Sequence, residues 1–496
     1  MKAFLLYRDR DFDLQQQLPP GAEAATQDLE LDTLFNAMAL GDTVLFEVAK
    51  KVILCGSKDP DAIVYRQDIL KDCLKNSAVV RDIYGIAVES IQREKKDFWS
   101  ILSDYPDSIL HRSVDVLQMF VGILKRLRSI AEQYSADFDS DGFKTFFAML
   151  RKELADDYFA IIRDHLRRLK FRGGVMISAE LGKGNKAKNY VLRKPNPPEG
   201  NWISRIIEQR APVYTFHLDP RDESGARALS ELNDRGINLV ANALAQSTDH
   251  ILSFFTMLRT ELAFYMGCLN LHAKLATEGE ATTFPVPVGS KDRKHSFHGL
   301  YDVCLALTLK TKMVSNDVGA DDKDLVIITG ANQGGKSTFL RSIGVSQFMM
   351  QAGMFVPAES FRANVCQRIF THYKREEDTT MKSGKFDEEL KRMSEIVDNL
   401  VPDSLLLFNE SFAATNDREG SEIASQIVSA LLEKRIKVFF VTHLYDFAHR
   451  FYEKNRTRGF FLRAERQPDG SRTFKLIEGE PLETSYGEDL YKKIFG

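Results

Sequence analysis

The stretch ITGANQGGKSTFL, residues 328–340, places three glycines and a lysine between an apolar run and a segment of helical character. Gly330, Gly335, Lys336 and Ser337 fit the pattern GxxxxGK[ST]. The run 325–329 is expected to be a strand, and a helix is expected to begin near Ser337. Glycines let the backbone curl so that its N–H groups face phosphate oxygens, and the helix N-terminus adds partial positive charge. In this context the pattern predicts a nucleotide-binding loop.

The loop chemistry assigns a role to each part of the motif. Lys336 is expected to reach the β and γ phosphates of ATP, and the Ser337 hydroxyl is expected to coordinate Mg²⁺. The predicted nucleotide-binding residues are Gly330, Ala331, Asn332, Gln333, Gly334, Gly335, Lys336, Ser337 and Thr338. ATP and Mg²⁺ are therefore the expected cofactors.

Two later apolar runs end in residues that suit nucleotide hydrolysis. The run SLLLF leads into Asn409 and Glu410. At this position a nucleotide hydrolase needs a residue beside the metal ion, followed by a carboxylate that polarises water. The run KVFFV leads to His443, from which an imidazole could sense the γ-phosphate. Taken alone, such a histidine is more often a hydrogen-bonded residue at a strand end. Beside the other motifs, Glu410 and His443 are predicted to be catalytic and Asn409 to lie at the metal.

The organisation of the chain separates an α/β part from a helical part. Past Pro285, short apolar strands alternate with helical stretches, which predicts an α/β P-loop NTPase domain at 285–496. Upstream we expect a polar leader at 1–30, a helical core at 31–160, a basic insert at 161–200 and a further helical segment at 201–284. In the core, Leu31, Leu34, Phe35 and Met38 keep helical spacing. Two short strands around a Gly, Asn and Lys turn are predicted at 173–195.

Composition narrows the class of protein. A chain of 496 residues exceeds what one hydrophobic core serves, so several domains are expected. The net charge of −3 gives no global basic field, and any nucleic-acid contact must come from a local patch. Five cysteines without a CxxC pattern suggest reduced thiols inside a cell. No signal peptide and no apolar run of the roughly 18 residues that a bilayer requires is visible. The prediction is a cytoplasmic protein without a membrane segment.

Local positive charge is concentrated in one segment. Residues 161–194 hold ten Lys or Arg against two acidic residues. Such a concentration of positive charge is explained about as well by a solvent-exposed loop as by a DNA-binding surface. Aromatic residues are few here, which favours sequence-independent contacts with the DNA backbone over stacking. The candidate DNA-binding residues are Lys170, Arg172, Lys183, Lys186, Lys188 and Arg193.

Together these motifs resemble the MutS ATPases, relatives of the ABC-type ATPases. The similar segments are TGANQGGKST at 329–338, FNESFAATNDREG at 408–420, VTHLYDFA at 441–448 and SYG at 485–487. The resemblance implies a helical lever and core, a small β-containing clamp at the basic insert, and an ABC-type ATPase domain. It also implies ATP hydrolysis coupled to conformational change in a homodimeric, DNA-binding clamp of DNA repair or recombination.

Departures from that family modify the expectation. Mismatch-reading members carry an N-terminal domain with a Phe-x-Glu motif, whereas about thirty residues precede the first core-type helix here, so mismatch recognition by that route is not expected. The family's C-terminal helix-turn-helix is not expected either, which leaves dimerisation to the ATPase faces. Asn409 stands where the family has an aspartate. Its amide oxygen can accept a bond from metal-bound water but adds no charge, so weaker Mg²⁺ binding is expected.

A second function class remains open. The chain could be a nucleotide-gated scaffold for protein partners that binds ATP, hydrolyses it little and does not bind DNA. Asn409 and the nearly neutral net charge favour the scaffold, while Glu410 and the basic insert favour the ATP-hydrolysing DNA clamp.

Overall fold

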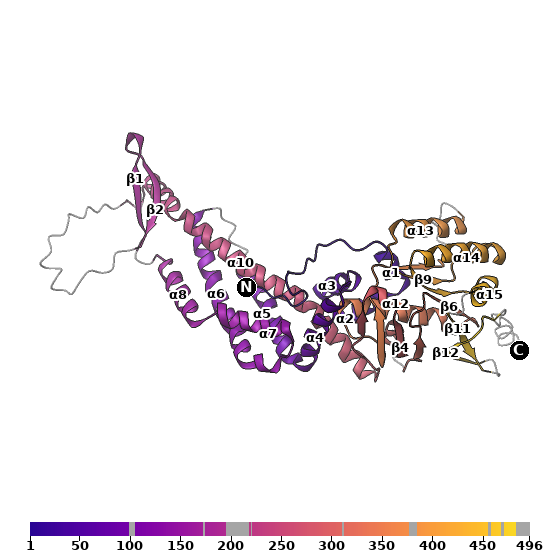
Figure 1. Ribbon diagram of the computed structural model, residues 1–496. Helices are drawn as coiled ribbons and strands as arrows, with labels where there is room; N and C mark the ends of the chain where they lie inside the picture. Colours follow the sequence, from indigo (N-terminus) through magenta and orange to yellow (C-terminus); the bar gives the residue numbers. More distant parts are fainter. Residues whose placement is uncertain are drawn as a thin grey trace. The chain divides into compact units, whose positions relative to one another are not determined.

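The computed structural model describes residues 1–98, 105–171, 174–194, 218–219, 221–309, 312–375, 384–454, 458–467 and 471–482. The chain forms two compact units. The first comprises Met1–Ala3, Arg81–Asp137 and Thr145–Arg259, and the second comprises Phe4–Val80, Phe138–Lys144 and Thr260–Gly496. The 55-residue helix α10 (Glu223–Thr277) contributes residues to both (Figure 1). Among the described helices, none combines the length and apolarity needed to cross a bilayer.

The first unit is mainly helical. Its helices are α5 (Ser77–Phe98), α6 (Pro106–Tyr134), α7 (Asp141–Glu153), α8 (Asp156–Arg168) and the first part of α10, with the short η1 (Ser135–Asp137) after α6. Apolar side chains at helical spacing form its core, and Phe120 packs on Phe255 with ring centroids 5.7 Å apart. The helical character predicted from periodicity in this region is confirmed, and the segment within 221–284, whose pattern fits either one long helix or a tight helical pair, is the single helix α10.

A β-hairpin belongs to the same unit. β1 (Met176–Leu181) pairs antiparallel with β2 (Ala187–Arg193), and η2 (Lys183–Asn185) forms the turn. The two predicted strands are therefore confirmed. Leu192 packs against a cluster containing Leu110 of α6 and Ile237 of α10. Close approach to α10 also requires Gly236, where a Cβ would lie 2.3 Å from the Ile177 side chain. The hairpin base is thus fixed within the unit, while Leu181 near the turn is 78% exposed.

The second unit is built on a six-stranded sheet with the order β12-β11-β6-β10-β9-β8. β12 is antiparallel to β11, and the other neighbours are parallel. The strands are β6 (Leu325–Thr329), β8 (Ile369–Tyr373), β9 (Leu405–Asn409), β10 (Lys437–Val441), β11 (Gly459–Arg466) and β12 (Arg472–Glu478). The three apolar runs of the sequence are the neighbouring strands β6, β10 and β9, so the predicted parallel α/β arrangement is confirmed.

Both faces of this sheet are covered, which explains why its strands read as continuous apolar runs. One face packs against α13 (Lys385–Asn399), α14 (Asp417–Glu433) and α15 (Tyr445–Lys454), through residues such as Phe408 and Phe440 (Figure 1). Side chains at the alternate positions of the strands point to the other face of the sheet. There Leu407 lies against Gly344 of α12 (Lys336–Ala352), and Phe439 contacts His295 of a second sheet.

The second sheet was not predicted from the sequence. It has the order β3-β7-β4-β5, from β3 (Val286–Val288), β4 (His295–Leu300), β5 (Asn316–Gly319) and β7 (Ser360–Asn364). Its strands are short and mix polar with apolar residues, so they carry little period-two signal. η3 (Ser290–Asp292) and α11 (Val303–Leu309) lie between its strands in the chain.

The N-terminal helices of the second unit are α1 (Ala22–Asp28), α2 (Leu31–Ala39), α3 (Thr43–Leu54) and α4 (Pro60–Lys75). The predicted helical stripe of Leu31, Leu34, Phe35 and Met38 is confirmed, since all four side chains are fully buried. The leader 1–30 is itself packed: Leu5 and Phe12 are buried, and their backbone N–H groups donate to the carboxylate of Glu261 at 2.6 and 3.2 Å. Its polar composition did not predict this packing.

Candidate functional site

The glycine-rich loop lies at the carboxyl edge of the six-stranded sheet. It joins the end of β6 to the start of α12, in the predicted order of strand, loop and helix. Gly330 and Gly335 have φ values of 106° and 83°, which side chains rarely tolerate. A Cβ at Gly330 would also lie 2.9 Å from the backbone nitrogen of Ala464 in β11. The glycines are therefore required both for the turn and for the close approach of β11.

Lys336 folds back over this loop. Its Nζ donates hydrogen bonds to the carbonyls of Gly330 at 2.9 Å and Ala331 at 3.1 Å, and the side chain is buried. Burial lowers the pKa of the ammonium, and the nearby Glu410 carboxylate opposes that shift. An ammonium held inside the loop by two neutral carbonyls is a ready partner for an anion that enters it.

Ser337 and Asn409 connect the first turn of α12 to the end of β9. The Ser337 hydroxyl donates to Asn409 Oδ1 at 2.9 Å. Both oxygens suit Mg²⁺, a hard cation that prefers oxygen ligands, but neither is charged. The described residues contain no group of three or more His, Cys, Asp or Glu that could hold a metal ion. This pair consequently fits Mg²⁺ only if phosphate oxygens and water supply the remaining ligands.

Glu410 and His443 meet at the same edge because β9 and β10 are neighbours. Glu410 adopts a left-handed φ of 55°, and its backbone N–H donates to the carbonyl of Val441 at 2.8 Å. Its Oε2 lies 3.3 Å from His443 Nε2. The hydrogen bond with His443 is the main cause that lowers the pKa of Glu410, and Lys336 and Lys374 add to it. The carboxylate is thus kept ionised beside the loop.

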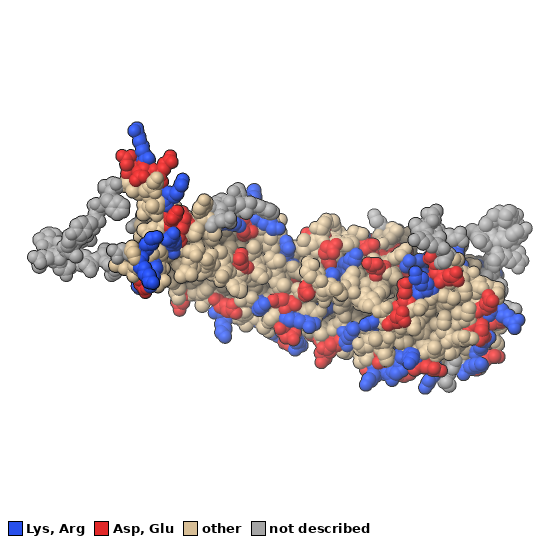
Figure 2. Space-filling model, turned by 90° about the horizontal axis from the view of Figure 1, so that it is seen from above, with Lys and Arg blue, Asp and Glu red and all other residues tan. Residues whose placement is uncertain are grey.

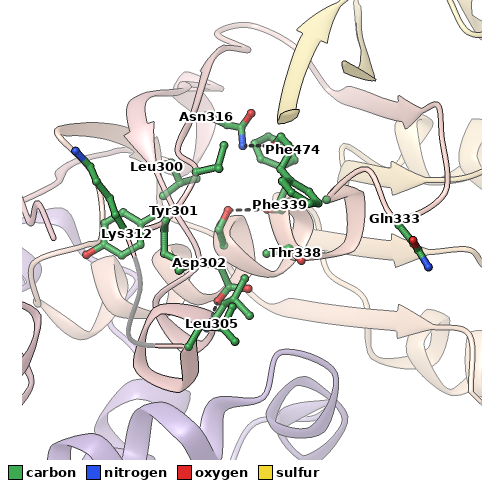
Figure 3. A pocket seen from close by; sticks show the side chains of 15 residues that line it. Leu300, Tyr301, Asp302, Leu305, Lys312, Asn316, Gln333, Thr338, Phe339 and Phe474 are labelled. Carbon is green, nitrogen blue, oxygen red and sulfur yellow. Dashed lines mark hydrogen bonds between the residues drawn. The ribbon is translucent and has the colours of Figure 1, made fainter. Parts of the chain in front are cut away.

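A cavity of about 410 Å³ opens beside the loop (Figure 3). Gln333, Gly335 and Thr338 border it from the loop and α12. Asn316 braces the wall, since its Nδ2 donates to Phe474 O at 3.4 Å and its Oδ1 accepts from Leu476 N at 2.7 Å. The apolar lining includes Leu300, Leu305, Met313, Val314, Phe339 and Phe474. Sequence reasoning missed this cavity because, apart from its border on the loop, its walls come from segments without a recognised motif.

The candidate DNA-binding residues lie in different parts of the structure. Lys183 lies in η2 and Lys186 just after it, and both are exposed. On β2, Lys188 lies 3.8 Å from Glu180, and Arg193 Nε donates to Ser178 Oγ at 2.8 Å. Figure 2 shows basic side chains along this hairpin, together with acidic ones.

Two candidates are not on the hairpin strands. Lys170 follows α8 and pairs with Asp115 of α6 at 3.6 Å. Arg172 lies outside the described residues, as does the SYG segment at 485–487.

Comparisons with known proteins agree with the motifs. The family model described as MutS2 N-terminal domain matches residues 58–278, and the model described as MutS domain V matches residues 326–494. The DNA mismatch repair protein MutS of Clostridium perfringens is 27% identical over 490 residues, covering 93% of this chain and 50% of that protein. Human MutS protein homolog 4 is 25% identical over 284 residues, covering 55% of this chain and 29% of that protein.

A relative from Thermotoga, also described as DNA mismatch repair protein MutS, is 31% identical over 229 residues, covering 45% of this chain and 28% of that protein. The chain spans about half the length of the curated relatives it matches, or less. The two matched family models lie on the helical region and on the domain that holds the loop, in the same chain. The chain belongs to the MutS family.

Proposed function

We propose that this chain is a Mg²⁺-dependent ATPase of the MutS type that works as a DNA-binding clamp. The observation that carries the proposal is the convergence at one sheet edge of Lys336, the Ser337–Asn409 pair and the Glu410–His443 pair. An ABC-type ATPase domain at 285–496 is part of the proposal. Each of these groups has a role in phosphoryl transfer, which depends on positioning and electrostatic stabilisation.

Binding of the triphosphate begins at the loop. Phosphate oxygens take the place of the carbonyls of Gly330 and Ala331 as partners of Lys336 Nζ, while the loop N–H groups donate to the remaining oxygens. Bound Mg²⁺ would supply charge neutralisation on the phosphates. The Ser337 hydroxyl oxygen would hold the ion, and Asn409 Oδ1 would accept a hydrogen bond from water bound to it. The cavity beside Thr338 has room and apolar walls for the base.

Hydrolysis is assigned to Glu410 and His443. The lowered pKa keeps Glu410 ionised, so its carboxylate can accept a hydrogen bond from the attacking water and orient it. His443 Nε2, 3.3 Å from that carboxylate, holds it in place and lies where it can sense the γ-phosphate.

The rest of the chain would convert the nucleotide state into DNA binding. We assign 1–30 as leader, 31–160 as helical core, 161–200 as clamp and 201–284 as lever, with α10 supplying a continuous helix for the lever. Two copies are proposed to pair through their ATPase domains. The exposed lysines of the hairpin would contact the DNA backbone without reading sequence. The name of the Clostridium relative points to DNA repair, and we propose DNA repair or recombination as the setting.

A second candidate is a nucleotide-gated protein scaffold with little hydrolysis and no DNA binding. The neutral Ser337–Asn409 pair favours it, because it gives bound Mg²⁺ no charged ligand. Steady-state ATP hydrolysis, measured alone and with duplex, branched or mismatched DNA at two salt concentrations, separates the two. DNA-stimulated and salt-sensitive hydrolysis supports the clamp. Slow hydrolysis that no DNA changes supports the scaffold.

A further inference from the structure

Two basic residues outside the loop motif lie at the same sheet edge. Arg472 opens β12, and its Nε donates to the carbonyl of Asn332 in the loop at 3.4 Å. Lys374 follows β8 directly, and its backbone N–H donates to the carbonyl of Asn409 at 2.9 Å. Both come from strands that flank the site, so neither is visible in the spacing of the motif.

Both residues lie next to the nucleotide site: Arg472 contacts the loop at Asn332, and Lys374 is hydrogen-bonded through its backbone to Asn409. Arg472 is one of the groups that lower the pKa of Lys336, and Lys374 is one of those that lower the pKa of Glu410. The positive charges of Lys336 and Lys374 thus act on Glu410 in addition to its 3.3 Å contact with His443. Asn409, the other candidate metal-side residue, is neutral and already accepts from Ser337. Positive side chains thus gather where the protein provides little negative charge for a metal ion.

We propose that Lys374 and Arg472 contact the triphosphate directly and take over part of the charge neutralisation that Mg²⁺ usually supplies. This inference rests on the nucleotide site proposed above. A guanidinium can bind phosphate through two parallel hydrogen bonds, and an ammonium acts as a point charge. An aspartate at 409 would repel a metal-free triphosphate, whereas the amide of Asn409 does not. The site consequently retains the nucleotide when the metal is removed.

Calorimetric titration with a non-hydrolysable ATP analogue, with Mg²⁺ and with EDTA, tests the inference. Wild-type affinity should fall by less than about tenfold in EDTA, and a K374A/R472A double variant should lose at least about tenfold more affinity in EDTA than in Mg²⁺. Asn409→Asp should act in the opposite sense, with tighter binding in Mg²⁺ and weaker binding in EDTA. Lys434→Ala, an exposed lysine before β10 at the opposite sheet edge, serves as the matched control and should behave as wild type.

The inference is overturned if wild-type binding is lost in EDTA, or if the double variant weakens binding equally in both conditions. Lys336→Ala separates this failure from failure of the proposed function. Loss of binding in Lys336→Ala, combined with either of those results, leaves the nucleotide site standing and removes only the role of Lys374 and Arg472. Unchanged binding in Lys336→Ala with Mg²⁺ rejects the site and the inference together.

Discussion

The hydroxyl of Ser337 donates a 2.9 Å hydrogen bond to Oδ1 of Asn409, which joins the first turn of α12 to the carboxyl end of β9. The loop and the strand that carries Glu410 are thereby held in register without a charged partner. In the proposed site the hydroxyl oxygen could bind Mg²⁺ through a lone pair while its hydrogen is donated to Asn409, so the first turn of α12 and the end of β9 would stay joined when the metal is bound.

Replacing Lys336 with Ala should abolish tight ATP binding, because the cation that faces the β and γ phosphates is removed from a buried position. Calorimetric titration in the presence of Mg²⁺ measures the loss. The variant should keep the far-ultraviolet circular dichroism of the wild type. Nucleotide affinity equal to that of the wild type would show that the loop does not bind the triphosphate in this way.

Glu410→Gln should separate binding from chemistry. The amide keeps the size of the side chain but not the charge that orients water, so ATP should bind normally and turn over at least about tenfold more slowly. Single-turnover hydrolysis alongside equilibrium binding gives both quantities. Wild-type turnover in this variant would exclude Glu410 as the group that activates water.

His443→Ala should change how hydrolysis depends on pH. In the wild type, the hydrogen bond with His443 is the main reason that the pKa of Glu410 is lowered, so the carboxylate stays ionised as the medium becomes acidic. Without the imidazole, burial raises that pKa and the acid limb of the kcat profile should move to higher pH. His298→Ala, an exposed histidine on β4, is the control. An unmoved acid limb in His443→Ala would mean that the pair does not set the protonation of Glu410.

The loop, the strand ends and the long helices could be predicted because their signals are local. Gly330 and Gly335 are needed for left-handed backbone, and the runs ending at Asn409 and Val441 are buried on both faces. Proximity of Glu410 to His443 followed from a general property, since parallel strands present their carboxyl ends at one edge. The sheet order that makes β9 and β10 neighbours is set by tertiary packing and not by the local sequence.

Features that depend on distant segments could not be predicted. Arg472 reaches the loop because β11 and β12 lie beside β6, and nothing in the local sequence around it indicates a phosphate. The cavity wall at Asn316 depends on contacts with Phe474 and Leu476, about 160 residues later in the chain. The packed leader depends on Glu261, a carboxylate that an apolar helical pattern does not single out.

Glu261 should make the stability of the second unit depend on pH. Burial raises its pKa from an ordinary 4.5 to about 7, although the backbone N–H groups of Leu5 and Phe12 favour the charged form. Between these two values the folded state holds a proton that the unfolded state has released. The free energy of unfolding should therefore fall by about 3 kcal/mol as the pH rises from 4.5 to 7.

Glu261→Gln should remove that slope, since the amide does not titrate. Chemical denaturation at pH 5 and pH 8 measures it in both proteins, with Glu395→Gln, an exposed carboxylate on α13, as the control. If the variant and the wild type show the same difference between the two pH values, Glu261 is not the group responsible.

The hairpin supplies the test of DNA binding. Lys183, Lys186 and Lys188 have exposed side chains, so reversing all three to Glu should change stability little. If they bind phosphates, affinity should fall similarly for every DNA sequence, and the slope of log affinity against log salt should shrink by about 0.9 for each phosphate that is no longer neutralised. Basal ATP hydrolysis should be retained, because the nucleotide site lies in the other unit, while any stimulation by DNA should disappear.

A matched variant sharpens that experiment. Reversal of Lys50, Lys58 and Lys71, which lie outside the hairpin on or beside α3 and α4, alters the net charge by the same amount. A general electrostatic effect would weaken DNA binding equally in both triple variants, whereas a clamp requires the hairpin variant to lose far more affinity. Unaltered affinity and salt slope in the hairpin variant would reject these lysines as DNA-binding residues, whereas failure of the wild type itself to bind DNA would make the nucleotide-gated scaffold the better account.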